Sequence, residues 1–209
     1  SSSSSSSSSI AKRKRLLEQQ HFKTIRDFVK SGEHTPKIKR LVKHIHRAIQ
    51  KNEWPIVVYS DWKDSGVRRI AREVLGPDRK IRVAEMTGDA KPWVNFKWDA
   101  SFGKLTKENV IQLYNHRHIH VVCFSAALGE GVDLHRTRHF HMVDGVWNPA
   151  KLEQAIGRAI RYKSHEKLPI DQRNVLVTQW ISTIPETKQN TYGIRTSIDE
   201  SLYNTVKTK

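Results

Sequence analysis

Short, mostly apolar runs recur along this chain and alternate with segments that have helical periodicity. The expected strands are Ile56 to Tyr59, Ile81 to Met86, His120 to Ser125, His139 to Asp144 and Asn174 to Ile181. Four helices are expected: one that begins at Thr35-Pro36, and others at Asp61 to Leu75, Thr106 to Asn115 and 148–161. Apolar strands that alternate with helices are typical of a parallel sheet with helices on both faces. The sequence therefore predicts an α/β fold of this class.

Composition divides the chain into predicted segments. Residues 1–9 are a low-complexity serine run that carries no fold information. Residues 10–34 form a basic extension, expected to be an amphipathic helix, whose run Lys12 to Arg15 is either a solvated helix start or a nucleic-acid contact. The α/β domain is expected at 35–185 and a C-terminal extension at 186–209. Residues 90–104 lack periodicity, which predicts a surface insertion.

The charge balance indicates an anionic partner. The 37 basic and 21 acidic residues give a net charge of +16, which favours nucleic acid or another polyanion. A single cysteine, Cys123, excludes an internal disulfide and a cysteine-based zinc site, so we expect an intracellular protein. No apolar run approaches the roughly 18 residues of a membrane span, and we expect no membrane partner.

The segment 148–161 combines an apolar helical side with a cationic side. At about 100° per residue, Gln154, Arg158 and Arg161 cluster within roughly 60°, opposite apolar residues such as Ala155. Paired guanidinium groups suit a shared phosphate. Gly157 costs about 1 kcal/mol inside a helix, so we expect a close approach to its backbone. The alternative is a solvated surface helix.

Polar residues end the predicted strands, where ligands bind in this architecture. They are Ser60, Thr87-Gly88-Asp89, Ser125 and Asp144. The glycine-containing loop from Ser125 to Leu134 can present backbone N–H groups to a phosphate, and Asp133 can hold a ribose hydroxyl. A plain glycine turn would have the same pattern.

Three of these motifs together resemble the second RecA-like lobe of superfamily 2 helicases. They are Ser125 to Leu134, Asp144 through Trp147-Asn148-Pro149, and Gln154-Ala-Ile-Gly157-Arg158-Ala-Ile-Arg161. The second and third are similar to Swi/Snf-like members, and the continuation Tyr162 to Pro169 resembles helicases of large cytoplasmic DNA viruses. The types concerned are poxvirus nucleoside triphosphate phosphohydrolase I and the early transcription factor ATPase. The resemblance covers roughly 35–185.

This resemblance implies a role for each matching residue. Arg158 and Arg161 would be catalytic, with Arg161 as the arginine finger. The resemblance places four further residues at the nucleotide: Gln154, Gly157, Gly131 and Asp133. It places four along the nucleic-acid backbone: Ser60, Thr87, Gly88 and Ser125.

The chain lacks two motifs of the complete family. Neither a Gly-x-x-x-x-Gly-Lys-[Ser/Thr] loop nor an acidic Mg²⁺-binding box occurs in the sequence. ATP and Mg²⁺ would therefore be held mainly by a first lobe, and the chain alone is expected to be inactive. A fragment of a longer protein, with that lobe in cis, is favoured over a lobe supplied by another chain.

The leading hypothesis is thus an ATP-dependent helicase lobe that binds DNA or RNA in viral transcription or genome handling. Viral RNA polymerase or transcription factors are possible partners, and a virion or cytoplasmic replication site is the expected location. The alternatives are a non-catalytic docking module for nucleic acid or polymerase, and a duplex translocase that does not unwind.

Clusters of histidine and of aromatic residues remain outside these motifs. The histidines are His116, His118, His120, His135, His139 and His141. Without a cysteine cluster or an obvious carboxylate partner, they predict no metal site. Trp93, Phe96, Trp98 and Phe102 either stack on single-stranded bases or fasten the insertion to the core.

Overall fold

The computed structural model describes residues 35–126, 132–145, 149–184 and 196–207. The chain divides into two compact units, 1–39 and 40–209. Of the first unit, only residues 35–39 are described, so the serine run and the predicted N-terminal helix lie outside the described residues. The second unit contains the sheet and both sites described below.

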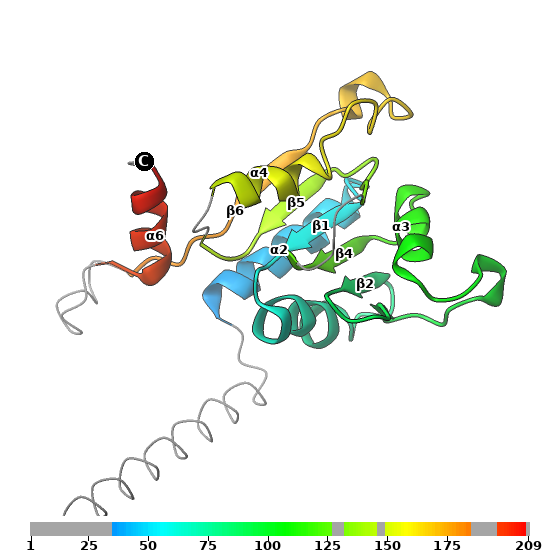
Figure 1. The fold of residues 1–209 in the computed structure, drawn as a ribbon, viewed down its shortest axis with the longest axis horizontal. Coiled ribbons are helices and arrows are strands. Elements are labelled where there is room, and N and C mark those ends of the chain that lie inside the picture. Colours follow the sequence, from blue (N-terminus) through cyan, green and yellow to red (C-terminus); the bar gives the residue numbers. More distant parts are fainter. Residues whose placement is uncertain (1–34, 127–131, 146–148, 185–195, 208–209) are drawn as a thin grey trace, which may run out of the picture. The chain divides into compact units, whose positions relative to one another are not determined.

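A six-stranded sheet with the order β3-β2-β4-β1-β5-β6 forms the centre of this unit (Figure 1). Its strands are β1 (Ile56–Tyr59), β2 (Val83–Met86), β3 (Trp93–Val94), β4 (Val121–Phe124), β5 (His139–Met142) and β6 (Leu176–Gln179). Every pairing is parallel except that of β3 with β2, which is antiparallel. The predicted parallel α/β fold is therefore confirmed.

Alternate residues of the buried strands face two different layers. Val57, Tyr59, Val122 and Phe124 join one apolar cluster with Leu113 of α3 (Lys107–Asn115) and Ala155 of α4 (Pro149–Gly157). The intervening strand residues face away from that cluster, since successive side chains of a strand point to opposite faces. On this second face η1 (Lys63–Leu75) packs against β2 and β4.

Local signals explain where several helices begin. The side chain of Thr106 accepts a hydrogen bond from the backbone N–H of Asn109 and so caps α3. Helix α2 (Pro36–Gln50) starts with proline, whose missing N–H is not needed in a first turn. Short helices η2 (Ala100–Phe102) and η4 (Ile170–Gln172), and helix α6 (Ile198–Lys207), complete the described elements.

Two details of the middle of the chain differ from the sequence prediction. The helix at 63–75 is wound with π-type hydrogen bonds, as in the bond from the Val67 N–H to the Trp62 carbonyl oxygen. The insertion at 90–104 is not purely a surface loop, because β3 adds an antiparallel edge strand to the sheet.

Within the described ranges, no helix is long and apolar enough to cross a membrane.

Candidate functional site

The ends of β1 and β5 are joined by a partly buried hydrogen-bond network. Asp144 follows β5, and its Oδ2 accepts hydrogen bonds from Ser60 Oγ at 2.5 Å and from the Asp61 N–H at 2.8 Å. Since β1 and β5 are neighbours in the sheet, the carboxylate holds two strand-end loops together. Ser60 is completely buried. Its hydroxyl therefore positions the loop in this structure.

Gly66 of η1 makes room for this network. A Cβ atom added at Gly66 would lie 1.9 Å from Ser60 Oγ and 2.8 Å from Ser60 Cβ. Any larger residue would displace the serine from Asp144. The sequence analysis missed this glycine, although a glycine inside the expected helix Asp61 to Leu75 was a usable signal.

A second network lies at the end of β2. Thr87 donates to Asp89 Oδ2 at 3.0 Å, and Asp89 also pairs with Lys63 at 2.5 Å and Arg68 at 2.7 Å. The hydrogen bond from Lys63 is the main cause that lowers the pKa of Asp89 below its ordinary value. Buried Glu85 adds ion pairs to Arg68 and to Arg72. The start of η1 is thus fixed to the strand end by charge.

The residues predicted to contact the nucleic-acid backbone share this edge of the sheet but differ in exposure. Ser60, Thr87 and Ser125 are buried, whereas Gly88 is exposed. The Ser60 and Thr87 hydroxyls both donate to carboxylates of the protein. Among the groups that this edge presents to solvent are the backbone at Gly88 and the partly exposed cations Lys63 and Arg68.

The arginine segment does not form the single helix that its periodicity predicts. Helix α4 ends at Gly157, so Arg158 and Arg161 lie beyond it. The Arg158 carbonyl oxygen accepts a hydrogen bond from the Leu134 N–H at 2.9 Å, and this tertiary contact replaces a further helical turn. At Gly157, no described atom lies within 4 Å of an added Cβ, so the described part of the chain makes no close approach there.

Arg158 nevertheless lies at the carboxyl edge of the sheet. Its guanidinium carbon is 5.9 Å from the centroid of the Phe124 ring, at the end of β4. Its charge also acts on Tyr59, at the end of β1, where burial and a 2.6 Å hydrogen bond to Asp61 raise the pKa of the phenol. Arg158 Nη1 is buried and has no hydrogen-bond partner within the described part of the chain.

Arg161 pairs with the loop residue that the sequence analysis assigned to the same site. Its Nη1 forms an ion pair with Asp133 Oδ1, and the two side chains are 47% and 42% exposed. Gln154 is exposed on α4. Gly131 lies outside the described residues, as do Trp147 and Asn148.

The aromatic residues of the insertion fasten it to the core. Phe96 and Trp98 pack against the apolar cluster, and Trp98 Nε1 donates to the Gly103 carbonyl oxygen at 2.9 Å. Arg72 lies over the Trp93 ring at 5.2 Å. These contacts favour the anchoring alternative over base stacking.

The histidines contain one association that sequence reasoning missed. His139 and His141 of β5 lie beside His44 of α2, a residue outside the histidines considered above. Only the tertiary fold brings a position on that helix next to β5.

Comparisons with known proteins identify the family of this chain. The sequence-family model of the helicase conserved C-terminal domain matches residues 36–163. A protein of Acanthamoeba polyphaga mimivirus, assigned as an ATP-dependent RNA helicase, is 32% identical over 162 residues, which cover 77% of this chain and 32% of that protein. Nucleoside triphosphatase I of Melanoplus sanguinipes entomopoxvirus is 34% identical over 97 residues, or 46% of this chain and 14% of that protein.

A solved structure has the same fold. The C-terminal part of the Fun30 ATPase domain superposes with a TM-score of 0.55 at 18% identity, and the match covers 82% of this chain and 47% of that one. The chain spans about a third of the length of the mimivirus relative. Because the family model matches more than half of its length, this chain belongs to the helicase conserved C-terminal domain family, with a RecA-like α/β fold.

Proposed function

We propose that this chain is the second RecA-like lobe of an ATP-dependent helicase or translocase, and that Arg161 is its arginine finger. An arginine finger stabilises the charge that develops on the transferred phosphoryl group. The names of the viral relatives support the ATP-dependent class, and the net charge of +16 supports a nucleic-acid substrate, DNA or RNA.

The observation that carries this proposal is how weakly the guanidinium groups of Arg158 and Arg161 are bound within the described part of the chain. Arg158 has a buried guanidinium nitrogen without a hydrogen-bond partner in the described ranges, at the sheet edge where ligands bind in this architecture. A buried donor without a partner is costly and suits an anion that arrives from outside. A phosphate between lobes meets that need.

Arg161 is held by an interaction that is easily exchanged. Half-exposed ion pairs such as Arg161–Asp133 contribute only about 0–1 kcal/mol. Arg161 can therefore leave Asp133 for a phosphoryl oxygen at little cost, and Asp133 keeps the guanidinium near the site until then. Gln154 and Gly157 of α4, just before the arginines, form the adjoining surface of the proposed nucleotide site.

ATP and Mg²⁺ need groups that this sequence does not contain. With no phosphate-binding loop or acidic box, we assign the phosphate cradle and the Mg²⁺ ligands to a first lobe, in cis or on another chain. On this chain, Lys63, Arg68 and the exposed backbone at Gly88 are the proposed nucleic-acid contacts. A viral setting and a link to transcription or a viral polymerase remain part of the proposal.

Replacing Arg161 by alanine in the complete gene product tests the proposal. We expect the nucleic-acid-stimulated rate of ATP hydrolysis to fall by about 10³- to 10⁵-fold, as when other arginine fingers are removed. Arg79→Ala, at an exposed arginine between η1 and β2, is the control and should retain the unmodified rate. An Arg161→Ala protein that folds and hydrolyses ATP normally would refute the assignment. A complete protein that binds nucleic acid but never hydrolyses ATP would favour the docking module instead.

A further inference from the structure

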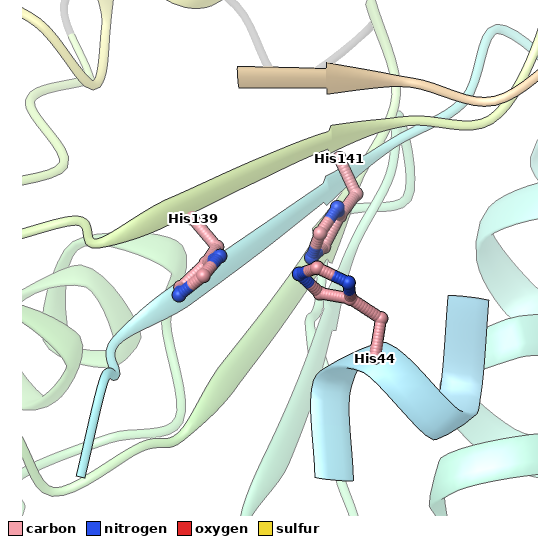
Figure 2. Close-up of side chains that lie close together, drawn as sticks. All are labelled: His44, His139 and His141. Carbon is pink, nitrogen blue, oxygen red and sulfur yellow. The ribbon is translucent and has the colours of Figure 1, made fainter. Parts of the chain in front are cut away.

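Three histidine side chains converge between helix α2 and strand β5. His44 projects from α2 toward His139 and His141 of β5 (Figure 2). One ring nitrogen from each lies within 4.8 Å of the others. The ring centroids of His44 are 5.5 Å and 5.1 Å from those of His139 and His141. This histidine trio lies on the sheet face opposite the apolar cluster of α3 and α4, and therefore apart from the arginine site.

Two nitrogens of the trio are buried without a partner. His139 Nδ1 and His141 Nε2 have no hydrogen-bond partner among the described residues. The two residues are 6% and 0% exposed. Leaving a buried polar atom unsatisfied costs about 1–3 kcal/mol, so two such atoms that face a third imidazole need a physical explanation.

Glu53 prepares His139 as a metal ligand. Its Oε2 lies 3.3 Å from His139 Nε2 and accepts the proton of that nitrogen, which leaves the lone pair of Nδ1 facing the trio. A carboxylate that accepts from the outer nitrogen of a histidine is the usual arrangement behind a metal-bound imidazole, because it sets the tautomer and the ring orientation.

The other two rings are also suited to coordination. His141 is completely buried, and burial disfavours the charged ring, so its environment favours the neutral form that binds metal. Trp180 Nε1 donates to His141 Nδ1 at 3.3 Å. Coordination through Nε2 requires the ring proton to move to Nδ1, which can then no longer accept, so metal binding replaces this long hydrogen bond. His44 is only partly buried, so it can turn toward an ion.

A solvent-accessible cleft reaches two members of the trio, His44 and His139. This cleft of about 290 Å³ is lined by His44, His139, Glu53, Leu176, Arg47 and Lys51. The positive charges of Arg47 and Lys51 disfavour the binding of a metal ion, and the negative charge of Glu53 offsets one of them. They also favour a hydroxide or another anionic group on the side of the ion that faces the cleft.

We propose that His44, His139 and His141 bind a divalent transition-metal ion, with Zn²⁺ as the best fit. Imidazole nitrogen is a preferred ligand of Zn²⁺, and three histidines with one open position form a known tetrahedral arrangement. Zn–N distances of about 2.0–2.1 Å place the nitrogens roughly 3.4 Å apart, so the side chains close by about an ångström. The ion fastens α2 to β5, and Glu53 orients His139 from the outer shell.

Metal titration of the full-length gene product tests this site. After removal of metals with EDTA, calorimetry with Zn²⁺ should detect a site that His44→Gln removes. Glu53→Gln keeps all three ligands and should weaken binding by about 10- to 100-fold. Co²⁺ bound in place of Zn²⁺ should produce the intense visible absorption of tetrahedral coordination, and His44→Gln should abolish it. Circular dichroism checks the folding of each variant.

A matched control separates this site from the surface histidines. His116→Gln and His118→Gln change exposed residues away from the trio and should leave the affinity for Zn²⁺ unchanged. The proposal is overturned if the unmodified protein binds no Zn²⁺, or if folded His44→Gln binds as tightly as the unmodified protein. Should His44→Gln fail to fold, an unchanged affinity in Glu53→Gln overturns the arrangement described here.

Discussion

Gly66 allows a direct test of how η1 is held against the strand ends. Gly66→Ala places a Cβ atom 1.9 Å from Ser60 Oγ, so the serine must leave its 2.5 Å hydrogen bond to Asp144. A hydrogen bond to a charged group contributes about 1.5–3 kcal/mol. Overpacking of a buried site costs about 1–3 kcal/mol more, while alanine in place of glycine in a helix returns about 1 kcal/mol. We expect the free energy of unfolding to fall by about 2–4 kcal/mol.

Urea unfolding of the single and double variants measures this loss. A decrease of that size lowers the melting temperature by roughly 5–15 °C for a domain of this size. In Ser60→Gly/Gly66→Ala the clash is absent, so the double variant should lose clearly less than the sum of the two single losses. Gly157→Ala is the matched control, since no described atom lies within 4 Å of its added Cβ. Additive losses, or equal effects at Gly66 and Gly157, would refute the steric argument.

Further predictions concern other parts of the fold. Thr106→Ala removes the cap on the Asn109 N–H and should lower the free energy of unfolding by about 1 kcal/mol in urea titration; an unchanged midpoint would contradict this. Cys123 is fully buried and burial raises its pKa, so a thiol reagent should label it only on unfolding, and rapid labelling of the folded protein would be the contrary result. Burial lowers the pKa of His120 below the ordinary 6.5, and its Nδ1 accepts from the Arg82 N–H at 3.0 Å. Because the unfolded state then binds more protons below pH 6.5, this residue makes stability fall as the solution is acidified. His120→Asn keeps an acceptor without titrating, so urea midpoints at neutral and acidic pH should differ less than in the unmodified protein, and an equal or larger difference would count against the prediction.

Much of the sheet could be predicted from local pattern. The apolar runs at β1 and β4 are continuous because these strands are buried on both faces, and Thr106 is a recognisable helix cap. Strand β3 could not be predicted in this way. It contains only two residues, Trp93–Val94, and it depends on pairing with β2.

The sequence indicated which residues belong to the candidate site, but it did not predict how those residues are arranged in space. Apolar periodicity continues through Ala159, and nothing local indicates that the Leu134 N–H takes the Arg158 carbonyl oxygen and ends the helix earlier. The association of Arg161 with Asp133 also depends on two segments that meet only in the folded chain. His44 was missed for the same reason, because it is distant in sequence from the histidines of β5.

The central claim is that Arg161 reaches the phosphates of a nucleotide held mainly by another lobe. The most direct measurement is a structure of the complete protein bound to nucleic acid, ADP and a fluoride mimic of the transferred phosphoryl group. The account predicts the Arg161 guanidinium within about 3 Å of the mimic, the usual distance of a charge-assisted hydrogen bond, and separated from Asp133. A complex in which Arg161 stays paired with Asp133, and in which neither Arg158 nor Gln154 contacts the nucleotide, would contradict it.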